Sequence, residues 1–504
     1  MKKNLNLCTD PWLPVRLCSG SCMLVSLEEF FSTAHEISDL ILAAHERISI
    51  MRLLICIAQR AINGPEDREQ WEECRDEISL KSVEYLRKWR HAFNLLGEDG
   101  AFLQVAGVEA RKPNDWGDLS KISMSCAEGN TPSLFDNSAG TQRSVSLSQI
   151  AIDLITYQNF APGGTIGVTL WSGVQTGQKS PDSAPAGPCV PSSAIHLFVC
   201  GENLLDTIWY NLCTNEDISL HRNGLGVPIW EKMPTHMEDE EAVLNATTTF
   251  LGRLVPISRV VKISADAEKC LLSKGIGYPV YSEDKALLYY ESTMSVMRTK
   301  DNKLRIVGAD IDRAMWRNLP ALLHRFTTDF KSLISLQLQD LPSHYGIWVG
   351  AMILDQAKVL GTMEDYYEHL DRKYVGVAAD KRQATLMGMA DHGIKSVRSA
   401  LLSYYSFLNN PFDNKKQVFS YAEKNFWSWL TLHKKMYVSC LGIADDDGDL
   451  YVNGTTTWAK IIRQAAYKTF DLLASRNNVR QLSAWARARR LLPSITKLLN
   501  ENGN

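Results

Sequence analysis

The stretch LILAAHERISIMRLLICIAQRAI, residues 40–62, carries the clearest structural signal in the chain. Its apolar side chains recur at alternating steps of three and four residues, at Ile41, Ala44, Ile48, Met51, Ile55 and Ala58. This spacing puts them on one face of a helix, so the segment predicts a helix packed in the core. His35 and His45 do not form the metal-binding pattern H-E-x-x-H, and we expect both to be structural.

The residues around this helix predict a body of mixed strands and helices. A strand is expected around Trp12–Val15, a turn at Ser19–Gly20, a second strand at Met23–Leu27 and a short helix near Val145–Ile155. Farther along, strands expected at residues 194–200, 286–292 and 303–309 alternate with helices and loops. This alternation indicates an α/β or α+β body that extends to about residue 330.

The chain after residue 345 is expected to be helical. Amphipathic segments are predicted at residues 383–408, 417–437, 456–475 and 479–499, with breaks at 409–411, 445–454 and 477–478. Helices of this kind with short connections predict a four-helix bundle. The predicted fold is therefore α+β, with a large N-terminal mixed α/β domain in residues 1–375 and a C-terminal four-helix bundle in residues 376–504.

Composition restricts the cellular setting. The 504 residues carry a formal net charge of −3, which argues against a surface coated in positive charge but is compatible with a local basic stripe. No apolar run approaches the length needed to cross a bilayer, and the N-terminus lacks the apolar core of an export signal. We therefore expect a cytoplasmic protein whose 11 cysteines are reduced and which has no membrane partner.

No cofactor, metal or catalytic residue is predicted. Cys18 and Cys22 form a close pair, but structural zinc needs four ligands and no second pair accompanies this one. The acidic loop ADDDGDLYVNG, residues 444–454, resembles a calcium loop, but its glycine is misplaced and Thr456 stands where the last ligand should be. The common catalytic signatures, such as G-x-S-x-G and the Walker lysine, are absent from the sequence.

The stretch QNFAPGGTIGVTLWSGVQTG, residues 158–177, contains five glycines and no charged residue. Lys179 lies outside a phosphate-binding G-x-x-x-x-G-K-[ST] pattern, and the glycines do not follow the order G-x-G-x-x-G. What remains is a backbone that can approach another surface closely, since glycine has no side chain to hold that surface off. The Pro- and Ser-rich residues 178–193 are expected to form turns or extended chain.

Four basic residues are expected on one face of the last predicted helix, opposite an apolar stripe of Leu482, Trp485 and Leu492. They are Arg480, Arg487, Arg490 and Lys497. Two interpretations stay open at this point. The face is either simply solvated or contacts the phosphates of a nucleic-acid backbone.

Taken together, the sequence resembles the CasA family, the large subunit of the type I-E CRISPR surveillance complex Cascade. The resemblance rests on the order and spacing of segments that cover the chain nearly end to end. They are LCTDPWLPVR, AHEISDL, LLICIAQRA, GEDGAFLQV, NTPSLFDN, QNFAPGG, GAMILDQAKVL, SVRSALLSYY and YAEKNFWSWL. The resemblance implies the same two-domain fold and a subunit of antiviral defence that is not an enzyme.

The resemblance also implies partners. They are the guide RNA, double-stranded target DNA, the other Cascade subunits (backbone, guide-RNA-end-binding and small subunits) and a helicase-nuclease that docks on the large subunit. In the family, the large subunit recognises the short PAM beside the target from the minor-groove side. It then opens the duplex so that an R-loop forms, and base pairing with the guide reads the sequence.

The family's site residues carry over by position. Phe135 and Asn137 lie in the segment similar to the guide-RNA loop, where an aromatic ring stacks or plugs. The loop that would face the PAM groove comprises Gly163, Gly164, Thr165, Ile166 and Gly167, and its Thr and Ile interrupt the glycine run of the glycine-richest relatives.

A second set of positions is similar to the family's wedge and its groove-reaching lysine. Gln356 matches the glutamine wedge, whose planar amide can hydrogen-bond exposed base edges. Asp355 would repel DNA unless Lys358 offsets its charge. For the lysine, Lys274 is preferred over Lys285 because glycines follow it on an expected hairpin.

Two other functions stay open from the residues alone. The first is a metal-dependent nucleic-acid hydrolase, which would need clustered acids or histidines around a divalent metal. The second is a purely structural scaffold of a ribonucleoprotein that makes no DNA contact.

Overall fold

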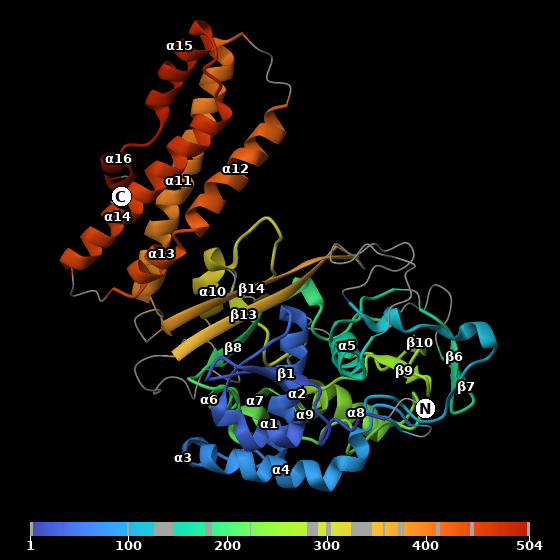
Figure 1. Ribbon diagram of the computed structural model, residues 1–504. Helices are drawn as coiled ribbons and strands as arrows, with labels where there is room; N and C mark the ends of the chain where they lie inside the picture. The colour runs from blue at the N-terminus through green and yellow to red at the C-terminus, as the bar shows by residue number, and fades with distance from the viewer. Residues whose placement is uncertain are drawn as a thin grey trace. The chain divides into compact units, whose positions relative to one another are not determined.

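The computed structural model describes residues 4–97, 100–124, 145–164, 166–176, 184–221, 223–279, 291–298, 304–323, 345–355, 358–370, 374, 377–409, 414–443 and 448–500 (Figure 1). The chain divides into two compact units. The N-terminal unit comprises residues 1–311 and 328–369, and the C-terminal unit comprises residues 312–327 and 370–504. The predicted mixture of helices and strands is confirmed. The predicted domain boundary at residues 375 and 376 stays a prediction.

Helix α2, Ala44–Ala61, runs through the N-terminal unit. The predicted apolar face is buried from Ile48 to Ala58, and the helix packs against α4 (Ile78–Trp89), α5 (Leu147–Phe160) and α9 (Phe250–Leu254). Ile41 was predicted to lie on this face, but it is 40% exposed and precedes the helix. Residues 37–40 belong to a strand, and residues 41–43 connect that strand to the helix.

That strand, β3 (Ile37–Leu40), pairs with β1 (Leu13–Leu17), which also pairs with β2 (Cys22–Val25). The expected turn is confirmed by Gly20, whose φ of +89° suits glycine. The expected second strand extends too far, because Leu27 already begins α1 (Leu27–Thr33). Ser26 stops the strand by capping this helix, its hydroxyl accepting a hydrogen bond from the backbone of Glu29 at 3.1 Å.

The other described strands form small sheets with the orders β5-β10-β9, β4-β6-β7, β14-β13-β8 and β11-β12. Their bounds are β4 Val108–Glu109, β5 Gly117–Asp118, β6 Thr169–Trp171, β7 Val174–Thr176, β8 His196–Cys200, β9 Arg259–Ile263, β10 Lys269–Lys274, β11 Val296–Arg298, β12 Leu304–Ile306, β13 Tyr345–Asp355 and β14 Lys358–Leu370. The remaining helices of this unit are α3 Arg68–Glu73, α6 Leu204–Tyr210, α7 Asn215–His221 and α8 Glu240–Thr248.

Two expected strands are confirmed by β8 and β12. Of the third, expected at residues 286–292, residues 291 and 292 are not in a strand and the others lie outside the described residues. The expectation of helix after residue 345 is wrong for β13 and β14. Residues Tyr345–Ile353 are all buried, so this strand shows no alternation that would distinguish it from a buried helix.

A buried ionic network joins α2 to distant segments. Arg52 donates to Glu291 at 2.6 Å, and Arg253 donates to the other oxygen of the same carboxylate at 2.5 Å. Arg52 also donates to the side chain of Asn159 at 3.0 Å and to the backbone of Leu254 at 3.1 Å. The side chains of Arg52, Arg253 and Glu291 are at most 3% exposed, so their charges are satisfied inside the protein.

A second buried carboxylate lies on α5. Asp153 is 8% exposed and accepts a hydrogen bond at 3.0 Å from Gln149, whose amide also donates to Glu46 at 3.1 Å. Burial, reinforced by the charge of Glu46, raises the pKa of Asp153 to about 7. The folded protein therefore binds a proton at Asp153 in a pH range where the unfolded chain does not.

The C-terminal unit is helical, with α10 Leu319–Leu323, α11 Val377–Phe407, α12 Lys415–Thr431, α13 Lys434–Leu441, α14 Gly448–Leu473, α15 Val479–Ala488 and α16 Ile495–Asn500. Helix α14 packs against α11, α12, α13 and α16. Trp316, which precedes α10, lies in the core of the C-terminal unit. Its ring is 4.9 Å from that of Tyr437 and 6.2 Å from those of both Trp427 and Trp458.

The predicted helix ends in this unit need three corrections. The segment expected at 417–437 is two helices, because α12 ends at Thr431 and α13 begins at Lys434. Residues 448–454 of the expected acidic break are the first turns of α14. The segment expected at 479–499 is interrupted after Ala488 and again before Ile495, where Pro493 cannot continue a helix.

We predict that Glu291→Gln lowers the free energy of unfolding by about 3–5 kcal/mol, because it removes the carboxylate that Arg52 and Arg253 share inside the protein. Urea unfolding measures this change. Glu423→Gln is the matched control, since it removes a carboxylate from a pair with Arg398 in which both side chains are 40% exposed. That control should cost less than about 1 kcal/mol. Equal costs would contradict the role given to the buried network.

The titration of Asp153 predicts a pH effect of definite sign. Its folded pKa lies above the ordinary carboxyl value, so its contribution to stability is greatest at low pH and is lost as pH rises toward about 7. Asp153→Asn should therefore stabilise the protein at pH 8, by up to about 4 kcal/mol, and change little at pH 4. Urea unfolding at both pH values measures this, and a variant that is destabilised at pH 8 would contradict it.

Candidate nucleic-acid interface

The glycine-rich segment begins where α5 ends and pairs with a strap formed by residues 184–193. Gly164 and Ala184 exchange backbone hydrogen bonds at 3.0 and 2.9 Å. The backbone amides of Gly187 and Cys189 donate to the carbonyls of Ala161 and Asn159 at 2.8 and 3.1 Å. Residues 184–187 of the strap are extended chain beside the glycine loop and residues 188 and 189 form a turn, as predicted, whereas Pro191–Ser193 form a short 3-10 helix.

Arg259, the first residue of β9, forms hydrogen bonds with both the glycine loop and the strap. Its side chain donates to the carbonyl of Pro162 at 2.6 Å and to the carbonyl of Pro185 at 2.7 Å. The residue is 2% exposed, and burial lowers the pKa of its guanidinium. An arginine in this position fixes loop and strap to the sheet through charge-assisted hydrogen bonds.

The glycines of the loop differ in how much space a side chain would have at each position. A side chain at Gly163 would meet the strap, 3.2 Å from the backbone nitrogen of Ala186. At Gly167 it would meet the backbone oxygen of Leu272 in β10 at 2.6 Å, which is too close. Gly164 has a φ of +136°, is exposed and has open space where a side chain would lie. Ile166 is half-buried.

Lys274 ends β10 on the side of the sheet where the loop lies. It pairs in register with Arg259, the residue that holds Pro162. The adjacent Ser273 forms a buried hydroxyl cluster with Thr169 and Thr176 at 2.9 and 2.6 Å, which fastens β10 to the strands after the loop. The structure thus brings Lys274 and the glycine loop together, with the lysine half-buried.

The strap also reaches the end of β13. The hydroxyl of Ser193 accepts a hydrogen bond at 3.0 Å from the backbone of Leu354, the residue before Asp355. Asp355 and Lys358 are exposed, and they end β13 and begin β14, neighbouring strands in one sheet (Figure 1). One strap therefore connects the glycine loop to the strand ends on either side of residues 356 and 357.

Several predicted residues lie outside the described residues. They are Phe135, Asn137, Thr165, Lys285 and Gln356. Their roles stay predictions.

The predicted row of basic residues is not on one helix. Arg480 and Arg487 lie on α15, Arg490 follows that helix, and Lys497 belongs to α16. All four are exposed, but Arg480 donates to the carbonyl of Leu408 at 2.8 Å and Arg487 lies 4.3 Å from the ring of Phe407. The apolar stripe is also wrong in part, because Leu482 is 48% exposed and Ala484 and Ala488 form the buried face.

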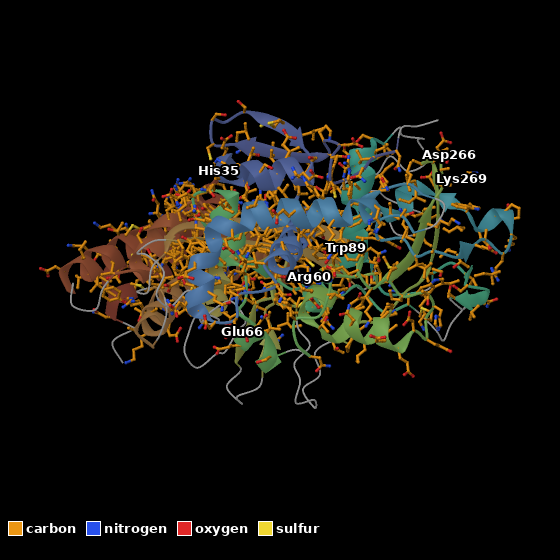
Figure 2. The ribbon with its side chains drawn as sticks, turned by 90° about the horizontal axis from the view of Figure 1, so that it is seen from below. His35, Arg60, Glu66, Trp89, Asp266 and Lys269 are labelled. Atoms are coloured by element: carbon orange, nitrogen blue, oxygen red, sulfur yellow. The ribbon has the colours of Figure 1, made fainter. Side chains whose placement is uncertain are left out.

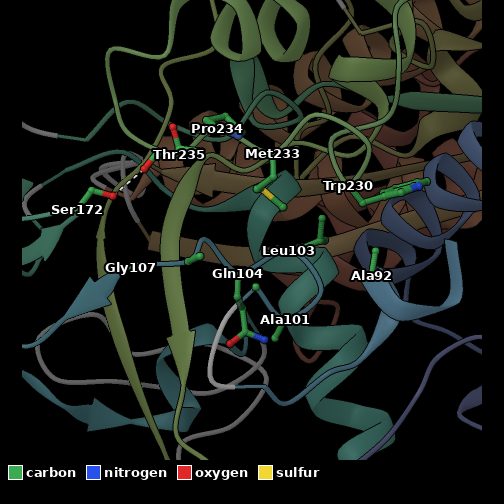
Figure 3. A pocket seen from close by; sticks show the side chains of 12 residues that line it. Ala92, Ala101, Leu103, Gln104, Gly107, Ser172, Trp230, Met233, Pro234 and Thr235 are labelled. Atoms are coloured by element: carbon green, nitrogen blue, oxygen red, sulfur yellow. Dashed lines mark hydrogen bonds between the residues drawn. The ribbon is translucent and has the colours of Figure 1, made fainter.

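A mainly apolar pocket of about 380 Å³ lies elsewhere in the N-terminal unit (Figure 3). Residues of the GEDGAFLQV segment line it, facing Trp230 and Met233. The polar groups at its edge are engaged, with Ser172 donating to the carbonyl of Thr235 at 2.8 Å and Gln104 donating to that of Leu95 at 2.7 Å. The residues that line the pocket include no charged residue, histidine or cysteine.

The part of the chain that the structure describes holds neither a metal-binding cluster nor a membrane-spanning helix. It contains no group of three or more His, Cys, Asp or Glu side chains that could hold a metal ion. Cys18 and Cys22 are exposed free thiols. No described helix is both long and apolar enough to span a bilayer.

Sequence reasoning missed Arg259 and the pairing of the strap with the glycine loop. Arg259 opens a strand whose other residues are mostly buried, and an arginine beside an apolar strand was the only available signal. The pairing of the strap with the loop left no signal in the sequence, because its hydrogen bonds join backbone groups and not particular side chains.

Comparison with known proteins gives consistent matches over most of the chain. The model of the family described as CRISPR-associated protein Cse1 matches residues 6–469. CRISPR-associated protein CasA/Cse1 of Thermus thermophilus is 28% identical over 386 residues, which cover 72% of this chain and 71% of that protein.

Solved structures share the fold. The crystal structure of Thermobifida fusca Cse1 matches with a TM-score of 0.78 and 20% identity, over 99% of this chain and 98% of that one. A chain of a CRISPR RNA-guided surveillance complex matches with a TM-score of 0.69 and 14% identity, over 97% of this chain and 99% of that one. At these identities the likeness concerns the fold.

We predict that Arg259→Gln loosens the glycine loop while the sheet stays folded. Losing the charge-assisted hydrogen bonds to Pro162 and Pro185 should speed amide exchange at Gly164 and Gly187 by about 10- to 100-fold. Hydrogen exchange read by mass spectrometry measures this. The control is Lys262→Gln on the same strand, which removes a hydrogen bond to Val108 instead and should leave these amides unchanged. Equal exchange in both variants would contradict the role of Arg259.

Proposed function

Because this chain belongs to the CRISPR-associated protein Cse1 family, we propose that it is the large subunit of a type I-E CRISPR surveillance complex, Cascade, in the cytoplasm. The likeness to a chain of an RNA-guided surveillance complex supports this proposal. In it the protein works as a non-catalytic module together with guide RNA and the other Cascade subunits. The C-terminal helices would form the family's four-helix bundle.

The proposed task is to recognise the PAM in duplex DNA and to begin its unwinding. The observation that best supports it is the strap, which links the glycine loop to the end of β13 by hydrogen bonds within one unit. A reader of flanking DNA and a wedge that parts the first base pair must act at a fixed separation. One rigid connection would provide that separation.

The physical roles follow from the groups available. Gly164 presents an exposed backbone without a side chain, which suits the narrow minor groove with its degenerate hydrogen-bond pattern. Lys274 would add a cation beside the loop, and Gln356 would insert its amide where the base pair opens. Lys358 would offset the charge of Asp355 near the phosphates. Phe135 and Asn137 would contact the guide RNA.

Once the duplex is open, base pairing with the guide reads the target sequence, and the protein reads only the flank. The large subunit would then help to recruit the helicase-nuclease that cuts the DNA. Chemistry is therefore assigned to that partner, and the role of this chain is recognition.

The proposal predicts that Lys274→Gln weakens flank-dependent binding. Wild type or variant is added to its own guide-RNA complex lacking the large subunit, and duplexes with randomised flanks are titrated. We expect wild type to restore flank-dependent binding and strand opening, Lys274→Gln to lose about 10-fold in affinity for preferred flanks, and Gln356→Ala to lose strand opening.

Lys269→Gln is the matched control, since Lys269 begins the strand that Lys274 ends, and lies beside Asp266 at the hairpin turn (Figure 2). It should behave as wild type. Flank-independent binding by the wild type would contradict the PAM-reading role. Full retention of DNA binding without Gln356 and the glycine loop would favour the scaffold, and metal-dependent cleavage by the isolated chain would favour a hydrolase.

A further inference from the structure

Charge is divided unequally along the chain. Residues 370–504 contain 20 of the 54 lysines and arginines but only 11 of the 57 acidic residues. The remaining residues carry the compensating negative charge, which is why the overall value of −3 hides the asymmetry. The C-terminal unit is therefore a basic body, and the arrangement of its cations decides what it can bind.

Five side chains of this unit form a continuous stack that alternates cations with aromatic rings. Arg463 lies 4.7 Å from the ring of Tyr467, and Arg489 lies 4.5 Å from the same ring. Arg489 also lies 4.8 Å from the ring of Trp485, and Arg476 lies 5.0 Å from that ring. We call this row, Arg463–Tyr467–Arg489–Trp485–Arg476, the arginine ladder.

The rings hold the guanidiniums of the ladder at set spacings. Two guanidiniums that share a ring can be no more than about 9–10 Å apart, since each lies within 5.0 Å of it. Asp471 is paired with Arg489 at 3.2 Å and accepts from Trp485 at 2.8 Å. Arg463 and Arg476, at the two ends, are exposed and have no acidic partner among the described residues.

We propose that the arginine ladder binds the phosphate backbone of duplex nucleic acid without reading its sequence. The stacked guanidiniums keep their N–H edges directed away from the rings, where they can donate to phosphate oxygens. Ordering by the rings reduces the entropy that each arginine loses on contact. The inference rests on the proposed function only in expecting DNA as the partner.

The ladder fits a duplex better than a single strand. Sites for single strands stack bases on open aromatic faces. Here Tyr467 and Trp485 are each contacted by two guanidiniums, so their faces are already engaged. The outside of a duplex presents its two phosphate backbones, and phosphates are what the unpaired ends of the ladder can bind.

The test measures fluorescence anisotropy of a labelled duplex with no guide match and no preferred flank, bound to the full chain over a salt series. The double variant Arg463→Gln with Arg476→Gln should reduce the slope of log K against log salt by about 1.8, and weaken binding about 60-fold at 0.1 M salt. The matched control, Lys416→Gln with Lys435→Gln, removes the same charge from exposed positions on α12 and α13 and should leave the slope unchanged.

A further variant separates the effect of stacking on the rings from the effect of the positive charges. Tyr467→Leu keeps every cation, so it should weaken binding while leaving the salt slope in place, and unfolding curves verify that it folds. An unchanged slope in the double variant, as expected of a surface for an acidic protein, would overturn the proposal. So would an equal loss for single-stranded oligo(dT) of the same length. Flank dependence in the guide-RNA complex is measured separately, so failure of the PAM-reading role would be recognised independently.

Discussion

The shared carboxylate of Glu291 is the interaction on which the N-terminal unit depends. Charges buried to this degree are tolerated only when they are paired and hydrogen-bonded, so the segments that carry them have to meet in one arrangement. Arg52 extends that requirement to Asn159, one residue before α5 ends. The position from which the glycine loop starts is therefore set by electrostatics in the core.

From that point outward, the candidate interface is built in layers. The backbone carbonyl of Asn159 accepts a hydrogen bond from Cys189 in the strap, and the strap pairs with the loop. The side chain of Arg259 then holds both segments to β9. Glycine is required where the backbone approaches most closely, as at Gly167 beside Leu272. A loop supported in this way can present bare backbone to a partner with little loss of conformational entropy on binding.

Local periodicity predicted the elements that have one buried face. It found α2 and the helical character of the C-terminal unit, and it failed at β13, where every residue from Tyr345 to Ile353 is buried and no alternation exists. The candidate site residues came from resemblance to a family. Arg259 and the strap escaped prediction because they depend on backbone groups brought together from distant parts of the chain. The arginine ladder was not predicted because its members come from α14, the loop after it, α15 and the short 3-10 helix that follows.

The core position of Trp316 has a consequence for how the protein is made. Because residues 312–327 belong to the C-terminal unit, the chain passes between the two units three times. During synthesis Trp316 leaves the ribosome more than a hundred residues before Trp458, the partner whose ring it meets edge-on. Trp316 therefore lacks this packing partner until the last helices have been synthesised. A single cut between residues 369 and 370 would separate residues 370–504 from residues 312–327, so the released C-terminal helices would lack part of their own interior.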